Sequence, residues 1–222
     1  MVIKFTRIAI LYAVLCFGAA GCHLASAANT PLPPPATDES VDAGAKLRTA
    51  VVAGGCFWGI QDVFQHVKGV VSATSGYSGG TAASAHYEVV SSGTTGHAES
   101  VEVIYDPKQI TYGQLLRVFF AVGHDPTQLN RQGPDDGVQY RSVIFYRDAE
   151  QQRIAEAYIA QLRDAKIFPR PIVTRVTPLK AFYEAEAYHQ DYARRHPHDM
   201  YIVFNDAPKV ENLQREFPEL YR

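Results

Sequence analysis

The sequence has few cysteines, and their positions are informative. Of the three in 222 residues, Cys16 and Cys22 lie near the N-terminus, and only Cys56 lies beyond residue 22. Exported proteins usually use cysteines in pairs, as disulfides, and Cys56 has no partner for one. A solitary thiol of this kind is either buried and inert or chemically reactive.

The sequence also lacks a strong charge of either sign. The formal net charge at pH 7 is −2, which does not support a nucleic-acid partner, since such partners favour a basic face. Beyond the N-terminus, no apolar run approaches the length that crosses a bilayer. We find no glycine-rich dinucleotide loop, no phosphate loop and no metal-ligand spacing, and therefore expect no cofactor and no metal.

Residues 1–27 have the pattern of an export signal. Lys4 and Arg7 precede an apolar run from Ile8 to Ala20. This run is short for a transmembrane helix and suits the central part of a signal peptide. We therefore expect an exported protein of the periplasm or cell envelope; an uncleaved anchor or a cytosolic protein is the remaining alternative.

Two processing sites compete in this leader. Ala25-Ser26-Ala27 suits cleavage after residue 27, whereas Ala19-Ala20-Gly21-Cys22 resembles a lipobox, which would end the leader at residue 21. In the second case Cys22 would carry a lipid anchor. Either route leaves Cys56 as the one free thiol of the mature chain.

A proline-rich segment, residues 28–46, follows the leader. It contains four prolines and several acidic residues but few large apolar ones. Such a composition predicts a semi-rigid or disordered spacer. The folded domain is then expected to comprise residues 47–222.

Strands and helices alternate through this domain. The expected strands are Arg48–Ala53, Val70–Thr74, Ser100–Tyr105, Tyr140–Tyr146 and Ile172–Thr177, and the expected loops are 76–80 and 124–137. The expected helices are Phe57–Val67, a helix from the capping box at Thr111 to Ala121, one behind Asp148 to about Ala165, and short ones near Tyr183–Arg194 and Pro208–Phe217. Because the alternation has no strict βαβ order, it predicts an α+β fold with a mixed sheet.

Cys56 stands between a predicted strand and a predicted helix. Backbone N–H groups and the helix dipole favour an anion at such a position, so we expect a stabilised thiolate. Gly54 and Gly55 allow positive φ and close approach of a substrate. Phe57 and Trp58 are neighbours in a helix and cannot both face the same core, so one of them is expected to line a surface pocket.

Gly55-Cys56-Phe57-Trp58-Gly59 resembles the signature of the peptide-methionine (S)-S-oxide reductases, the A-type methionine sulfoxide reductases. The resemblance continues, in the family's order, through Gly76-Tyr77-Ser78-Gly79-Gly80, Tyr87-Glu88-Val89-Val90-Ser91-Ser92-Gly93, Thr95-Gly96-His97-Ala98-Glu99, Tyr105-Asp106-Pro107, His124-Asp125-Pro126, Arg131-Gln132-Gly133-Pro134-Asp135, Gln139-Tyr140-Arg141-Ser142 and Ala185-Glu186-Ala187-Tyr188-His189-Gln190. It spans nearly the whole chain from about residue 48 to 205. It implies a two-layer α/β sandwich whose mixed sheet has a ferredoxin-like core.

The resemblance also implies catalytic roles. Cys56 would attack the sulfur of methionine-S-sulfoxide, free or in peptides and proteins. Glu99 would protonate the departing oxygen, which requires a pKa raised by burial. Tyr87 and Tyr140 would hydrogen-bond that oxygen.

Three further residues match the family's substrate site. Phe57 and Trp58 would form walls that accept the methyl group and so select one epimer. Asp135 would hold the substrate backbone or the water network of the site.

The C-terminal segment departs from the family pattern. Many members carry one or two further cysteines there, and this chain has none. The sulfenic acid formed on Cys56 therefore requires an outside reductant: a thioredoxin-like protein, a glutaredoxin or a small thiol. We expect the enzyme to be a monomer.

Two other functions compete with this one. A Cys-His hydrolase or transpeptidase of the cell envelope would pair Cys56 with His97 or His189 and would need an oxyanion site. A non-enzymatic envelope lipoprotein would bury Cys56 as an inert thiol.

Overall fold

The computed structural model describes residues 32–41 and 44–222. The expected signal peptide and both of its processing sites lie outside these residues, so they stay predictions. Within the described part of the chain, no helix is both long enough and apolar enough to cross a membrane.

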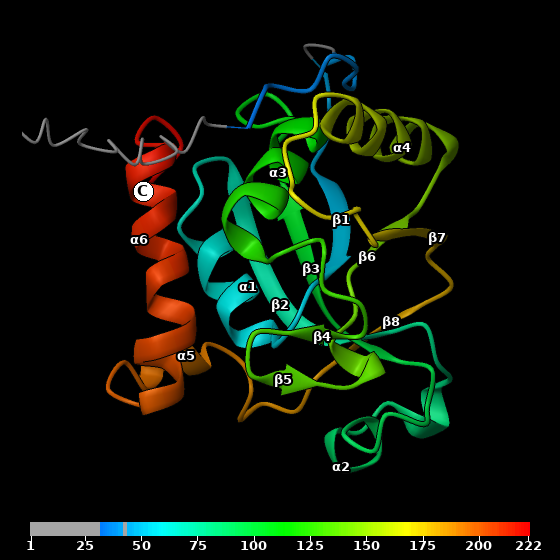
Figure 1. Ribbon diagram of the computed structural model, residues 1–222, viewed down its shortest axis with the longest axis vertical. Coiled ribbons are helices and arrows are strands. Elements are labelled where there is room, and N and C mark those ends of the chain that lie inside the picture. Colours follow the sequence, from blue (N-terminus) through cyan, green and yellow to red (C-terminus); the bar gives the residue numbers. More distant parts are fainter. Residues whose placement is uncertain (1–31, 42–43) are drawn as a thin grey trace, which may run out of the picture. The chain divides into compact units, whose positions relative to one another are not determined.

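A six-stranded mixed sheet lies at the centre of the fold (Figure 1), with strand order β7-β6-β1-β3-β2-β8. The strands are β1 (Arg48–Ala53), β2 (Val70–Ser78), β3 (Ala98–Tyr105), β6 (Val143–Tyr146), β7 (Arg175–Pro178) and β8 (Phe182–Glu184). Neighbouring strands are antiparallel except β6 and β7, which are parallel. The predicted mixed sheet is confirmed.

Helices and short turns connect these strands. The α-helices are α1 (Phe57–Gln65), α2 (Tyr87–Val90), α3 (Tyr112–Val118), α4 (Ala149–Asp164), α5 (Tyr192–Arg195) and α6 (Ala207–Glu216). The turns are 3-10 at Ala82–Ser84 and Val138–Tyr140, and π-helical at Phe119–Gly123 and Ile202–Asp206. The order β1-α1-β2-β3-α3-β6, with β6-β1-β3-β2 adjacent in the sheet, is the ferredoxin-like core of the predicted α+β fold.

Strand β1 is buried on both faces. Val52 belongs to the main apolar core, together with Val101 of β3 and Ile60 of α1. Val51 belongs to a smaller cluster on the opposite face, with Phe145 of β6. Burying such side chains stabilises the fold by about 1.5–3 kcal/mol each. The chain that leaves β1 therefore emerges from a firmly packed strand at the middle of the sheet.

Two predicted helix starts are confirmed by their caps. Thr111 Oγ1 accepts a hydrogen bond from the Gln114 N–H, and Gln114 Oε1 accepts one from the Thr111 N–H, which completes the capping box of α3. Asp148 accepts a hydrogen bond from the Gln151 N–H and caps α4. Each cap satisfies backbone donors that a helix cannot pair itself.

Two predicted elements are wrong because tertiary pairing decides them. Gly76–Ser78, expected in a loop, continue β2, and Tyr77 pairs with Glu99 across to β3. Gly76 has no Cβ, and one there would lie 2.4 Å from the Tyr183 carbonyl oxygen of β8. Residues near Tyr183, expected to be helical, instead form β8 on the edge of β2.

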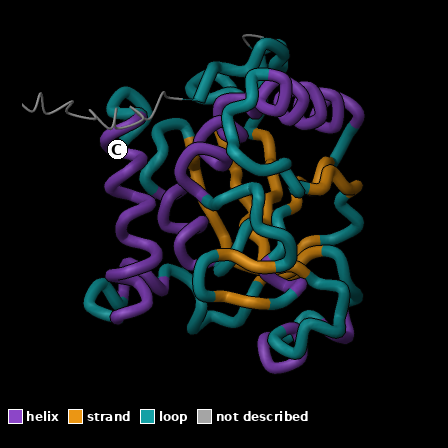
Figure 2. The backbone as a smooth tube through the Cα atoms, viewed as in Figure 1, coloured by secondary structure: helices purple, strands orange, loops and turns teal. Residues whose placement is uncertain are grey.

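Other boundaries differ by a few residues. The strand expected from Tyr140 begins at Val143, after a 3-10 turn, and the strand expected from Ile172 begins at Arg175. The loop expected at 124–137 contains a small hairpin, β4 (Arg131–Gln132) and β5 (Asp135–Asp136). Loops, drawn teal in Figure 2, still make up much of the chain between α4 and α5.

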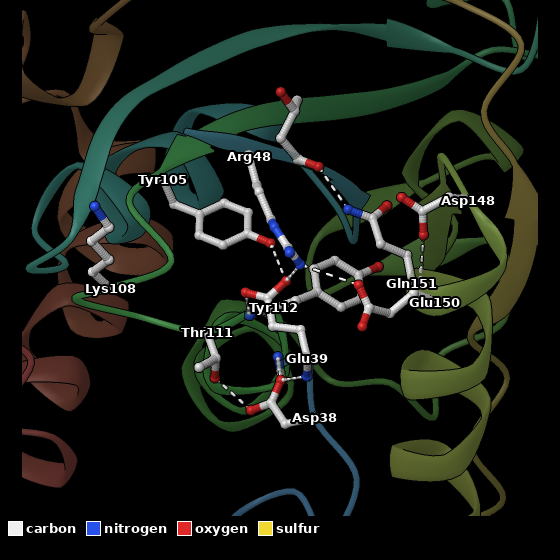
Figure 3. A network of polar contacts seen from close by, with 12 residues as sticks. Asp38, Glu39, Arg48, Tyr105, Lys108, Thr111, Tyr112, Asp148, Glu150 and Gln151 are labelled. Atoms are coloured by element: carbon white, nitrogen blue, oxygen red, sulfur yellow. Dashed lines mark hydrogen bonds and ion pairs between the residues drawn. The ribbon is translucent and has the colours of Figure 1, made fainter. Parts of the chain in front are cut away.

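The predicted spacer is wrong for residues 32–41, the N-terminal strap, which packs on the domain. Leu32 joins the apolar core. The buried Glu39 carboxylate accepts hydrogen bonds from Arg48 Nη1 at 2.6 Å and from the Tyr105 hydroxyl at 3.0 Å (Figure 3). A segment poor in apolar residues is thus ordered by charge-assisted hydrogen bonds, and the folded domain begins before residue 47.

The strap also contacts the start of α3. Asp38 accepts a hydrogen bond from the Thr111 hydroxyl (Figure 3). It also accepts one from the Gly113 N–H. Anionic groups are stabilised at a helix N-terminus, where backbone N–H groups are free. The strap therefore lies beside the beginning of β1, whereas Cys56 follows the end of that strand.

Candidate active site

Cys56 is the N-cap residue of α1, just after β1 ends. The chain turns there through Gly55, whose φ is +102°, and a Cβ on Gly55 would lie 2.6 Å from Gln132 Cγ. Glycine is therefore required by both conformation and space. Cys56 is a free cysteine that is 8% exposed, so its thiol lies just beneath the surface.

Glu99 lies next to this thiol. Strand β3 places its side chain, which is 2% exposed, so that Oε2 accepts a hydrogen bond from the Phe57 N–H at 3.1 Å. Burial raises the pKa of Glu99 to about 8; Asp135 and Asp206 also raise it, and the Phe57 N–H lowers it. At neutral pH Glu99 is therefore mainly a neutral acid that can donate a proton beside Cys56.

The expected resting thiolate is wrong. Burial raises the pKa of Cys56 well above its usual value, and the charges of Glu99 and Asp206 raise it further. The backbone N–H of Trp58 and the Lys209 ammonium lower the pKa of Cys56, but by less. The free enzyme thus holds a thiol, because burial outweighs the favourable helix terminus.

Two phenols face the same centre from different elements. Tyr87, in α2, and Tyr140, in a 3-10 turn, are both half-buried. Burial raises the pKa of both, and the charges of Glu99 and Cys56 raise each further. Both therefore stay protonated and can donate a hydrogen bond to an oxygen placed between them.

The two aromatic residues after Cys56 both pack against His189 but differ in exposure. Phe57 is 1% exposed and packs in the core near Tyr77. Trp58 is half-buried and stacks on Tyr192, with ring centroids 3.8 Å apart and planes at 11°. Of the two expected walls, Trp58 offers the more accessible face.

Asp135, in β5, is joined to the site by Tyr201, a residue of the C-terminal segment. The Tyr201 hydroxyl donates a hydrogen bond to Asp135 Oδ2 at 2.5 Å, and the Tyr201 ring meets Trp58 edge-on at 6.0 Å. Tyr201 is one of thirteen tyrosines in the sequence and stands in no recognised motif. Its position becomes visible only when the C-terminal segment packs against α1.

Neither candidate histidine pairs with Cys56. The Gly80 N–H donates to His97 Nδ1 at 3.2 Å, and His97 Nε2 lies 3.0 Å from the Thr81 carbonyl oxygen, so this ring orders a loop. Trp58 Nε1 donates to His189 Nδ1 at 3.2 Å, which places His189 at the N–H edge of the indole, where its ring also packs against Tyr87. This arrangement offers no base of the kind that a Cys-His hydrolase needs.

Comparisons with known proteins agree with this geometry. The model of the family described as peptide methionine sulfoxide reductase matches residues 48–220. Peptide methionine sulfoxide reductase MsrA 2 of Mesorhizobium japonicum is 58% identical over 184 residues, which are 83% of this chain and 93% of that protein. Its namesake in Synechocystis sp. is 47% identical over 203 residues, which are 90% of this chain and 95% of that protein.

Solved structures show the same likeness. Mxr1 from Saccharomyces cerevisiae in reduced form has a TM-score of 0.62 and 33% identity, over 72% of this chain and 91% of that one. Methionine sulfoxide reductase A of Corynebacterium diphtheriae has a TM-score of 0.59 and 35% identity, over 74% of this chain and 82% of that one. The chain therefore belongs to the peptide methionine sulfoxide reductase family.

Proposed function

We propose that this enzyme reduces methionine-S-sulfoxide, free or in peptides and proteins, to methionine, with Cys56 as nucleophile and Glu99 as proton donor. The observation that carries these roles is the contact between Glu99 and the amide that directly follows Cys56. This contact places a buried acid beside a thiol. Such a pair suits a substrate whose sulfur is attacked while its oxygen gains a proton.

The chemistry balances with these two groups alone. The Cys56 sulfur forms a bond to the sulfoxide sulfur, and Glu99 protonates the sulfoxide oxygen. The sulfur–oxygen bond of the substrate and the new sulfur–sulfur bond then break as the hydroxyl group passes to the Cys56 sulfur, which leaves Cys56 as a sulfenic acid, oxidised by two electrons, and releases the substrate as the thioether. The thiol proton restores Glu99, so the carboxyl group finishes the step as it began.

The remaining residues bind and orient the substrate. Tyr87 and Tyr140 donate hydrogen bonds to the sulfoxide oxygen, and Trp58 and Phe57 accept the methyl group. Asp135, held by Tyr201, binds the substrate backbone or a water network. A sulfoxide sulfur is a stereocentre, so fixing its oxygen and its methyl group selects the S epimer by shape.

The oxidised enzyme is recycled by an outside thiol. Cys56 is the only cysteine of the sequence beyond residue 22, so a mature chain has no second thiol to condense with its sulfenic acid. A thioredoxin-like protein is the reductant that we favour. Mass spectrometry after one turnover without reductant should show about 16 Da added to Cys56, and an internal disulfide would contradict this scheme.

We further propose that the enzyme is exported to the periplasm or cell envelope, either free of its leader or anchored by a lipid on Cys22. The charged and apolar pattern of residues 1–27 supports export. Fractionation of cells that express the chain and its Cys22→Ser variant tests both forms. A membrane-bound wild type and a released variant would indicate the lipid, whereas cytosolic protein in both would contradict export.

The central test is an assay with separated S and R epimers of a methionine sulfoxide peptide, with dithiothreitol as reductant. We expect activity on the S epimer only. Glu99→Gln should lose roughly a hundredfold or more in turnover, and His97→Asn should lose little among molecules that remain folded. The reverse result, with His97 essential and Glu99 dispensable, would favour a Cys-His enzyme.

A further inference from the structure

A carboxylate and an ammonium group lie behind the first turn of α1. Asp206 ends the π-helical turn before α6; it is 0% exposed, and its Oδ1 accepts a hydrogen bond from Lys209 Nζ at 2.9 Å. A Cβ on Gly59 would lie 2.1 Å from Asp206 Oδ1 and 2.8 Å from Lys209 Nζ. Both charges therefore touch the turn of helix that Cys56 caps.

Stability alone does not explain this pair. Asp206 Oδ2 is buried and has no hydrogen-bond partner among the described residues. Burial raises the pKa of Asp206, while Lys209 lowers it. A buried acceptor without a partner costs about 1–3 kcal/mol, and well-packed apolar residues in place of both partners would be expected to be at least as stable as this buried pair.

The two charges act on the thiol in opposite directions. Asp206 raises the pKa of Cys56 and Lys209 lowers it. The ionisable groups that face the thiol from the surrounding elements are Glu99, Tyr87, Tyr140, Tyr192, Tyr201, Asp206 and Lys209. Two further carboxyl groups, those of Asp135 and Asp62, act on Asp206 and raise its pKa. At neutral pH Glu99 and the phenols are mainly uncharged, which leaves Asp206 and Lys209 as the opposing charges.

We propose that Asp206 and Lys209 form a positioning charge pair that sets how readily Cys56 ionises. The inference rests on Cys56 as the nucleophile of the proposed function. Lys209 favours the thiolate needed for attack, and Asp206 both holds the ammonium group against α1 and limits its effect. The pair comes from the C-terminal segment, where the resemblance implies resolving cysteines that this chain lacks.

The test measures the alkylation of Cys56 by iodoacetamide between pH 5.5 and 10, followed by mass spectrometry of the peptide that contains it. Lys209→Met should raise the thiol pKa and slow alkylation at pH 7 by at least about threefold, which corresponds to half a pKa unit. Asp206→Asn, which keeps the side-chain shape, should accelerate it by a similar factor. The double variant should return near the wild-type rate.

Two controls separate charge from structure. Lys209→Arg keeps the cation and should lie closer to wild type than Lys209→Met. Lys108→Met changes an exposed lysine remote from the site and should leave the rate unchanged. A purely structural role would lower the melting temperature of the variants without moving the thiol pKa in opposite directions.

Shifts of the same sign in Lys209→Met and Asp206→Asn, or no shift in either, would overturn the proposal. If Lys209→Met does not fold, the test depends on Asp206→Asn alone. Alkylation of this variant that is unchanged or slower than in the wild type overturns the proposal. Alkylation is measured without sulfoxide, so such a failure leaves the reductase function standing. The proposed function fails by a different result, namely sulfoxide reduction by a Cys56→Ser variant.

Discussion

Replacing Glu99 by glutamine should lower turnover roughly a hundredfold or more and at the same time stabilise the fold. Glutamine keeps the shape of the side chain and can still accept the Phe57 N–H, but it has no acidic proton. Burial, aided by Asp135 and Asp206, holds the pKa of Glu99 at about 8, against 4.5 for an unperturbed glutamate. The native state therefore resists the ionisation that an unfolded chain undergoes freely.

The sign and size of the stability effect follow from linkage. Between pH 4.5 and 8 the native state binds the Glu99 proton more tightly than the unfolded state does, so stability falls as pH rises through this window. At about 1.4 kcal/mol for each pH unit between 4.5 and 7, the cost at pH 7 is on the order of 3 kcal/mol. Glu99→Gln removes this cost.

Urea unfolding at pH 5, 7 and 8 measures the effect. The gain in the free energy of unfolding for Glu99→Gln should be small at pH 5 and approach the full value near pH 8. Glu102→Gln, three residues along the same strand, serves as the matched control for a glutamate-to-glutamine change in β3. A destabilised Glu99→Gln protein, or a gain that does not change with pH, would refute the buried neutral acid.

Catalytic activity should depend on the protonation of Glu99. In the wild-type enzyme kcat/KM should fall as pH rises through about 8, since Glu99 loses the proton that the sulfoxide oxygen needs. A profile that keeps rising to pH 10 would show that thiol ionisation alone limits the rate.

Three other outcomes are expected. Glu39→Gln should lower the free energy of unfolding by about 2–4 kcal/mol, because it weakens buried charge-assisted bonds, and turnover of the folded enzyme should be unchanged; a slower folded variant would contradict this. Gly55→Ala should destabilise by about 1–3 kcal/mol in thermal melts, because its φ is +102° and Gln132 fills the space; a stability equal to wild type would argue against the turn. Met200 is 65% exposed, so peroxide should add about 16 Da to it; dithiothreitol should remove part of this mass in wild-type protein but none in Cys56→Ser, and equal loss in both would refute repair by Cys56.

The parts of the fold that the sequence predicts are those fixed by neighbouring residues. Thr111 and Gln114 specify a helix start within four residues, and Asp148 does the same for α4. Alternating apolar residues locate β3, because the period of a strand shows in eight residues. The choice of Cys56 as the proposed nucleophile is equally local, since it has no possible disulfide partner beyond residue 22.

What the sequence does not predict depends on distant contacts. The strap looks like a spacer because Glu39 gains its partners only when Arg48 and Tyr105 fold around it. Strand β8 forms where β2 offers an unpaired edge. Its Phe182 and Tyr183 are of types common in strands, but a strand of three residues is too short to show a period in the sequence. Tyr201 and Asp206 join the site from the C-terminal segment. Neither belongs to a short sequence motif from which its place in the site could be predicted.

The protonation states of Cys56 and Glu99 depend on each other, and for this reason the helix position of Cys56 alone does not predict a resting thiolate. A helix N-terminus favours an anion, but Cys56 and Glu99 share one buried space, and a charge on Glu99 opposes ionisation of the thiol. Below about pH 8 Glu99 is neutral, so it does not oppose ionisation of the thiol. At higher pH the Glu99 carboxylate is negatively charged and opposes it. In the proposed mechanism, the carboxylate that remains when a sulfoxide accepts the Glu99 proton can take the proton from the thiol as the sulfur attacks. The same burial that disfavours a resting thiolate therefore couples its formation to the arrival of an oxygen that needs a proton.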